Sequence, residues 1–468
     1  MPKIFISFFN AVYDPAAPHA MPCFYESFIK ELADRGNTLL VLHHRRFSQN
    51  FGKLPQVLKN KIAEFSPDFA IIFNNAFYDL SEDFDFPIYI YEVDSVIYYS
   101  NIDILKKKKE RFKYIVPQIS SIDAIHDYIG VDKKNILHVP FFSSVRREDL
   151  PKTMNISFIG TRFVPCGSDG KTAWNRFMYS KPSSDAIKTF KKALKTVQLH
   201  PYITQQELVS KFQSGDFDAS NFLNTDELIS TISGSIRILT LSEISDLGLT
   251  IFGPESWYKE NSIDCNIPLS YNRRVVYSLK HNQDIYNSSR LAINVNHVQA
   301  MTGFSWRVCD IMASDACLVS EYKPDFERYF PNVPIPLFTS RYEARSLCLK
   351  LLNNENMRRD IVEKCNEAID KQFRFENMLP VLEDFLGISL KESNGSEGER
   401  TIEALETSTD RTFPRGTSSA AQKWELKKRG KLFFYLTVLI LAQIPGFDLL
   451  LSESRRNKLL KKINKYWR

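Results

Sequence analysis

The sequence lacks the cysteine patterns that build metal clusters or disulfide frameworks. It contains no CxxC pair and no spacing typical of zinc ligands, which argues against a zinc module or a dithiol redox motif. The number of cysteines is odd, so we expect reduced thiols in a reducing compartment. The seven cysteines are scattered along the chain, at positions 23, 166, 265, 309, 317, 348 and 365.

A long apolar segment at the start and abundant glycine are also missing. The opening residues, MPKIFISFFNAVYD, carry one lysine and an apolar run too short for a signal peptide, so we expect a first strand there. Glycine numbers only 17, whereas phenylalanine and tyrosine number 35 and 20. A chain of 468 residues with this composition can bury a large core, and its length indicates two to three domains.

A strong excess of charge is absent from most of the chain. Residues 423–468 hold 12 Lys/Arg against 3 Asp/Glu, a net charge of +9, whereas the whole chain carries only +6. The rest of the chain is therefore slightly acidic, with a net charge near −3. The basic character describes a tail, and we expect no nucleic-acid partner for the body.

Residues 1–150 alternate between short apolar runs and segments of helical period. In the segment 21–35, Phe24, Phe28, Ile29 and Leu32 fall on one helical face, and a glycine follows. Strands separated by helices predict a parallel sheet covered on both faces, that is, a doubly wound Rossmann-like α/β domain. The expected strands are KIFISFF, TLLVLHH, FAIIFNN, FPIYIYEVD, YIVPQ and NILHVPFF.

The same alternation restarts after residue 150 and predicts a second doubly wound domain over 151–388. Its expected strands are MNISFIGTR, LTIFGPESW, SRLAINVNH, ACLVSEY and IPLF. Residues 163–245, between the first two of these strands, are too long for a loop and read as a helical insertion. Residues 389–422 are rich in Ser, Thr, Gly and Glu, which predicts a disordered linker.

Residues 423–468 form a basic and apolar tail. Residues 432–447 are nearly continuously apolar but short of a confident membrane span, and a basic amphipathic segment follows. We expect amphipathic helices lying on an anionic cytoplasmic membrane leaflet, which would make the protein cytoplasmic and peripheral at the inner face of the cell membrane. The alternative is a helical pair that docks on a partner protein or on the body.

Two doubly wound domains in tandem create a cleft between the carboxyl ends of their strands. Ligands of open α/β sheets bind at that edge, where free N–H groups at helix N-termini suit phosphate. A nucleotide-containing ligand is therefore the natural expectation.

A family resemblance sharpens this expectation. The run YNSSRLAINVNHVQAMTGFSWRVCDIMASDACLVSEYKPDFERYF, residues 286–330, resembles the C-terminal half of the CgeB/YkvP-like family of GT-B glycosyltransferases. That family reads roughly "iYnsSkiaLNi…g…R.fEaLAcGgfllTd…dle.lF". The resemblance covers about residues 60–160 and 246–388, and it implies a GT-B fold and transfer of a sugar from a nucleotide-activated donor without a metal or other cofactor.

The resemblance also implies a binding site for the nucleotide sugar in the second domain. Arg307 would pair with the diphosphate, Asp310 would accept hydrogen bonds from the ribose, and Gly303, Phe304 and Gly160 would lie close to the phosphates. Tyr286 and Asn287 open the motif. The plainer alternatives are an N-terminal helix acid for Asp310, a salt bridge between Arg307 and Asp310, and ordinary turns at the glycines.

Three positions depart from the family pattern. The family's glutamate is Asp310 here, its usual glycine is Asp315, and the second acid of retaining enzymes is replaced by Thr302. Retaining or inverting stereochemistry therefore stays open.

Candidates for catalysis lie in the first domain. Asp94 and Glu92 follow a strand at its carboxyl end, where a general base for the acceptor is expected. His19, in the first strand-to-helix loop, is a further candidate for accepting the hydroxyl proton. The plainer alternative for all three is a solvated loop side chain.

The sequence thus predicts a hexosyl- or related transferase acting on a cell-surface or lipid-linked glycan. Two alternatives stay open. One is a non-catalytic GT-B-like glycan-binding or scaffold protein at the membrane, and the other is a different nucleotide-sugar enzyme such as an epimerase.

Overall fold

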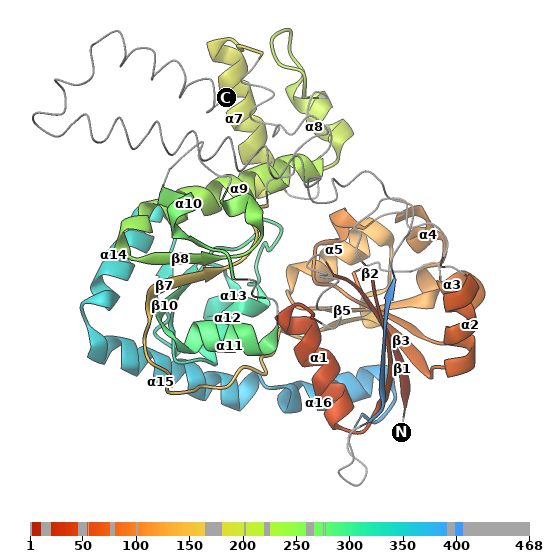
Figure 1. Ribbon diagram of the computed structural model, residues 1–468. Coiled ribbons are helices and arrows are strands. Elements are labelled where there is room, and N and C mark those ends of the chain that lie inside the picture. Colours follow the sequence, from red (N-terminus) through yellow and green to blue (C-terminus); the bar gives the residue numbers. More distant parts are fainter. Residues whose placement is uncertain are drawn as a thin grey trace, which may run out of the picture. The chain divides into compact units, whose positions relative to one another are not determined.

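The structure is a computed structural model, and the residues that it describes all lie within residues 1–405 (Figure 1). The described residues are 2–10, 20–44, 54, 56–74, 80–99, 102–163, 180–200, 203–219, 225–258, 266–274, 276, 278–390 and 398–405. His19 and the predicted tail 423–468 lie outside them. No helix in these ranges is long and apolar enough to cross a membrane.

The first domain is built on a parallel sheet with the strand order β13-β2-β1-β3-β4-β5-β6. Its strands are nearly free of exposed side chains, as expected when helices cover both faces. The strands are β1 Lys3–Phe9, β2 Thr38–His44, β3 Phe69–Phe73, β4 Ile88–Tyr91, β5 Phe112–Val116, β6 Ile136–His138 and β13 Arg400–Leu405. The helices are α1 Cys23–Asp34, α2 Gln56–Phe65, α3 Leu80–Asp83, α4 Ile102–Lys107 and α5 Ser120–Ile129. The predicted apolar face of α1 is confirmed, because Phe24, Phe28, Ile29 and Leu32 are all buried.

The second domain has a parallel sheet with the order β12-β11-β10-β7-β8-β9. Its strands are β7 Met154–Ile159, β8 Leu249–Phe252, β9 Tyr271–Asn272, β10 Ser289–Asn294, β11 Cys317–Glu321 and β12 Leu337–Phe338. Its helices are α10 Asn266–Ser270, α11 Leu279–Asn287, α12 Trp306–Met312, α13 Asp325–Tyr329, α14 Arg341–Leu352 and α15 Glu355–Gln372. In both sheets the chain starts in the middle and the strand order reverses, between β1 and β3 and between β7 and β10, and in the first sheet β13 later returns to the edge beside β2. The predicted pair of doubly wound α/β domains is confirmed, and ligands bind such sheets at the points where the order reverses.

The predicted insertion between β7 and β8 is helical where it is described. It contains α7 Ser184–Leu199, α8 Gln205–Phe212 and α9 Thr225–Glu243. These helices share a small apolar core around Phe190, Leu208 and Ile229, against which Ile97 and Tyr98 of the first domain also pack. The insertion therefore contacts both domains.

The predicted end of the second domain at residue 388 and the linker over 389–422 need correction. Helix α16, Phe375–Leu386, leaves the second domain and packs on the first, where Tyr89 donates a hydrogen bond from its hydroxyl to the carbonyl of Leu386 at 3.0 Å. Strand β13 then pairs in parallel with β2. Because this segment is polar, its sequence did not predict the six-residue strand. The strand is stabilised by backbone hydrogen bonds to an exposed edge of the sheet.

Candidate functional site

A cavity of about 320 Å³ lies where residues at the carboxyl ends of both sheets come together. The first domain lines it with Asp94 and with aromatic and apolar side chains, and the second lines it with Arg307, His297 and the glycine-containing ends of β7 and β8. Of the predicted site residues, Asp94, Gly160, Phe304 and Arg307 line this cavity. The remaining lining residues include Phe9, Tyr25, Gln118, Phe141, Gly253, Asn282, Asn296, Gln299 and Trp306.

Asp94 is the carboxylate of the first-domain wall. It follows β4, and its two oxygens accept hydrogen bonds from the side-chain amides of Asn74, at 3.1 Å, and Gln299, at 2.9 Å. Burial raises the pKa of Asp94, while the bonds from Gln299 and Asn74 act in the opposite direction. A carboxylate held by amides and facing a cavity is suited to accept a proton from a bound hydroxyl.

Glu92 does not share this position. Its side chain is buried and does not line the cavity, contrary to our expectation that it faces the cleft. Residues two apart in an extended segment point to the same side, as we expected of Glu92 and Asp94. The chain bends at Val93 and Asp94, so the two carboxylates point in different directions. Burial raises the pKa of Glu92 to about 7.

Arg307 supplies a cation to the second-domain wall, in the first turn of α12. Its Nε atom is buried without a hydrogen-bond partner among the described residues, and within that part of the chain its guanidinium forms no ion pair. The alternative of a salt bridge between Arg307 and Asp310 is not realised between these two described residues. Burial lowers the pKa of Arg307, with Tyr286 and Asp310 opposing this shift. A half-buried guanidinium without a counterion is a ready site for a phosphate or another anion.

Other positive groups surround Arg307 and increase the local positive potential. Arg237, fully buried in α9, donates from its guanidinium to the carbonyl of Thr161 at 2.7 Å and also to that of Val295. Burial lowers the pKa of His297 to about 3, and the positive charges of Arg237, Lys323 and Arg307 add to this effect. His297 is therefore neutral at physiological pH, and Arg307 is the cation that lines the cavity among the described residues, with Arg237 and Lys323 behind it.

Gly160 and Gly253 allow the ends of β7 and β8 to approach closely beside the cavity. A Cβ atom on Gly253 would lie 2.2 Å from the carbonyl oxygen of Gly160, and its φ of 157° is one that other residues rarely adopt. The same carbonyl accepts a hydrogen bond from the indole nitrogen of Trp257 at 2.8 Å. Sequence analysis selected Gly160 but not Gly253, although both glycines directly follow a strand.

We expect Gly253→Ala to destabilise the fold by about 2–4 kcal/mol, because it combines backbone strain with overpacking against a fixed carbonyl. Urea unfolding measures this change. Gly215→Ala is the matched control, because a Cβ there meets nothing within 4 Å. Equal effects of the two substitutions would contradict the close approach at Gly253.

Gly303 has a different role from the predicted phosphate-binding turn. It does not line the cavity, and a Cβ there would lie 2.5 Å from the Cβ of Gln118 in the first domain. Its backbone N–H donates to the side chain of Gln118 at 3.4 Å, and the neighbouring Thr302 hydroxyl contacts Ser120 at 3.2 Å. Gly303 therefore lets the two domains approach each other.

Asp310 also lies outside the cavity lining, contrary to the predicted contact with a ribose. Its carboxylate accepts hydrogen bonds from the hydroxyl of Ser143, at 2.7 Å, and from the thiol of Cys23, at 3.5 Å. Both donors come from the N-terminal 150 residues, so Asp310 holds this part of the chain against α12. Burial raises the pKa of Asp310 to about 6, although both hydrogen bonds favour the ionised form.

This raised pKa gives a stability prediction with a definite sign. A carboxyl whose pKa is higher in the folded state favours folding while it is protonated, and this contribution is lost as pH rises from about 4 through about 6. Asp310→Asn removes the ionisation. We therefore expect its free energy of unfolding, relative to the wild type, to increase between pH 4 and pH 7 in urea titrations. A difference that stays constant with pH would show that Asp310 ionises without cost.

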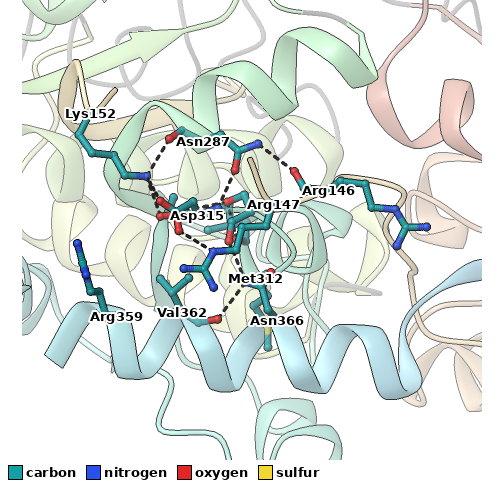
Figure 2. A network of polar contacts seen from close by, with 12 residues as sticks. Arg146, Arg147, Lys152, Asn287, Met312, Asp315, Arg359, Val362 and Asn366 are labelled. Carbon is teal, nitrogen blue, oxygen red and sulfur yellow. Dashed lines mark hydrogen bonds and ion pairs between the residues drawn. The ribbon is translucent and has the colours of Figure 1, made fainter. Parts of the chain in front are cut away.

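Tyr286 and Asn287 do not reach the cavity either. Tyr286 is buried and does not line it. Asn287 belongs to a separate polar network, in which it bonds the carbonyl of Arg146 at 2.9 Å and the backbone N–H of Asp315 at 2.8 Å (Figure 2). Asp315, where the family pattern has glycine, pairs with Arg147 at 2.7 Å and with Lys152 at 2.6 Å. These residues fix the segment that connects the two sheets. Because neither Tyr286 nor Asn287 lines the cavity, neither is placed to contact a nucleotide sugar bound there, contrary to our prediction.

Sequence reasoning missed three residues of the site. Asn74 directly follows β3 at its carboxyl end, and the same rule that selected Asp94 would have selected it. Gln299 and Arg237 gave no such signal, because one acts across the two domains and the other lies in the middle of a helix. Within the described part of the chain, no group of His, Cys, Asp or Glu side chains is placed to hold a metal ion.

Comparison with known proteins agrees with this architecture. Residues 237–384 match the glycosyl transferase-like family, and no curated protein sequence matches the chain. The structure resembles sucrose-phosphate synthase from Thermosynechococcus elongatus, with a TM-score of 0.50, 10% identity, and coverage of 82% of this chain and 98% of that one. A likeness at this identity concerns the fold, and it places the two Rossmann-like domains in the GT-B class. The narrower CgeB/YkvP-like resemblance stays a prediction.

Two further structures are similar at lower scores. A T4 phage BGT mutant in complex with UDP-glucose has a TM-score of 0.44 and 12% identity, covering 83% of this chain and 100% of that one. HepE from Anabaena in complex with UDP-glucose has a TM-score of 0.46 and 11% identity, with the same two coverages.

Proposed function

We propose that this protein is a glycosyltransferase that moves a sugar from a nucleotide-activated donor to the hydroxyl of a glycan acceptor. One observation carries the proposal. One cavity joins Arg307, whose guanidinium forms no ion pair with the described residues, to an amide-held carboxylate, Asp94, and the two come from different Rossmann-like domains. The match of residues 237–384 to the glycosyl transferase-like family supports it.

The two groups suit the two halves of a glycosyl transfer. Asp94 accepts the proton of the acceptor hydroxyl while the oxygen of that hydroxyl forms a bond to the anomeric carbon. The bond from that carbon to the phosphate oxygen breaks, and the nucleoside diphosphate leaves with the electron pair. Arg307 then stabilises the negative charge on the leaving group, with Arg237 adding to the positive potential. In this proposal the side-chain cations take the place of a metal ion.

The acceptor side of the cavity supports a sugar acceptor. Phe9, Tyr25 and Phe141 of the first domain line the cavity together with Asp94, and Trp306 of α12 adds a further aromatic side chain. Aromatic faces carry partial negative charge and attract the weakly positive C–H groups on one face of a sugar ring. A cell-surface or lipid-linked glycan at the inner face of the cell membrane remains our proposal for the acceptor, supported by the basic and apolar sequence of residues 423–468.

The products of the full chain with UDP-, GDP- and dTDP-glucose and a mixed oligosaccharide acceptor test this function. A transferase releases free nucleoside diphosphate and lengthens an acceptor, and both products are visible by mass spectrometry. An altered but intact nucleotide sugar would instead indicate an epimerase. Binding of oligosaccharide with no change in any donor would indicate a glycan-binding scaffold.

A further inference from the structure

Asp94 is oriented by side chains from both domains. On the first-domain side, Asn74 accepts the backbone N–H groups of Val93 and Asp94 through its Oδ1, each at 2.8 Å, and donates from its Nδ2 to the carboxylate. Asn74 adopts a φ of 58°, in the left-handed region that asparagine tolerates better than most residues. One side chain thus fixes both the backbone and one carboxylate oxygen of Asp94.

The second carboxylate oxygen is held from the other domain. Gln299 follows β10, and its Nε2 donates to Asp94 while its Oε1 accepts the backbone N–H of Ser95 at 3.0 Å. Both ends of this amide are therefore used on the Asp94–Ser95 segment. We propose that Gln299 is a positioning residue for the general base, so that Asp94 is correctly oriented only when the second domain is docked against it. This inference rests on the function proposed above.

Gln299 is also linked to the positively charged residues of the second domain. Its backbone N–H lies 3.2 Å from Nδ1 of His297, which must accept this bond and so must carry its proton on Nε2. Burial keeps His297 neutral, helped by the charges of Arg237, Lys323 and Arg307, and thereby preserves its ability to accept. The residues suited to the donor phosphates and the base are thus connected through His297 and Gln299.

Holding the domains together does not require Gln299. Other interdomain contacts exist, between Ser143 and Asp310, between Gln118 and Gly303, and between His138 and the hydroxyl of Tyr329 at 3.0 Å. What distinguishes Gln299 from these is that it bonds a carboxylate facing the cavity.

The inference predicts a change in pH dependence. An N–H donor stabilises the ionised carboxylate, so loss of Gln299 should raise the pKa of Asp94. Two further titratable groups face Asp94, namely Tyr25 from α1 and Glu92 behind it. Burial and the charge of Asp94 raise the pKa of Tyr25, which therefore stays neutral, and Glu92 is present in all the variants compared.

The test measures kcat/KM against pH for release of nucleoside diphosphate by the full chain, using the glucose nucleotide that the wild type turns over. Gln299→Ala should lower kcat/KM about tenfold or more and move its acid limb to higher pH, with little change in donor KM. Gln299→Glu places a second carboxylate beside Asp94 and should move the acid limb further. Tyr329→Phe, which removes the interdomain contact with His138 outside the cavity lining, should leave the acid limb in place.

Two other results would overturn the inference, and they are distinguishable. If Gln299→Ala lowers stability like Tyr329→Phe but leaves the acid limb in place, Gln299 only ties the domains together. If the wild-type chain turns over none of the three nucleotides, the proposed function itself fails and the role of Gln299 as a positioning residue fails with it.

Discussion

Replacing Asp94 by asparagine should reduce sugar transfer by about a thousandfold while nucleotide affinity stays within a factor of about two. Asparagine keeps the size and can keep a contact with Gln299, but it cannot accept a proton from the acceptor hydroxyl. Steady-state release of nucleoside diphosphate measures the transfer, and calorimetric titration measures nucleotide affinity.

The neighbouring Glu92→Gln is the matched control, because it removes a carboxylate of the same strand end that does not line the cavity. We expect this variant to keep most of its activity. Full activity of Asp94→Asn would contradict the role of Asp94. His19, the remaining candidate from the sequence, would then be the proposed base.

Replacing Arg307 by alanine should weaken binding of the nucleoside diphosphate by about a hundredfold. A hydrogen bond to a charged group contributes about 1.5–3 kcal/mol, and 2.7 kcal/mol corresponds to a factor of about one hundred in affinity. Arg307→Lys should recover only part of the loss, because an ammonium cannot form the paired contacts of a guanidinium. Calorimetric titration gives the dissociation constants.

The control for Arg307 is Arg290→Ala, an exposed arginine of the same domain that does not line this cavity. It removes the same charge from the chain and should leave nucleotide affinity nearly unchanged. If both substitutions weaken binding equally, the effect comes from net charge and not from a site at Arg307.

The sequence was sufficient to predict the two sheets and the domain half from which each reactive group comes. Buried parallel strands appear in the sequence as apolar runs between helices, and ligand sites lie at their carboxyl ends. Asp94, Gly160 and Arg307 could therefore be predicted as site residues. Strand β13 could not be predicted, because six residues within a polar segment show too weak an apolar pattern.

The side chains near Arg307 show where a motif stops being informative. Asp310 lies three residues beyond Arg307 in α12, about 4.5 Å further along the axis at 1.5 Å per residue, and it does not line the cavity. Its partners Ser143 and Cys23 are distant in sequence, as is Gln299 from Asp94. Contacts across the two domains leave no period or spacing in a single sequence, so only the folded chain shows which motif residues face the cavity.

The central claim is that the cavity between the two domains is a nucleotide-sugar site. Thermal unfolding of the full chain with UDP, GDP, CMP and dTDP tests it most directly, because only a ligand that binds the folded state stabilises it. One nucleotide at about 100 times its dissociation constant should add roughly 2.7 kcal/mol to the free energy of unfolding, and Arg307→Ala, with its hundredfold weaker binding, should reduce the gain to about 0.4 kcal/mol at the same concentration. No stabilisation by any of the four, or equal stabilisation of wild type and Arg307→Ala, would contradict the account.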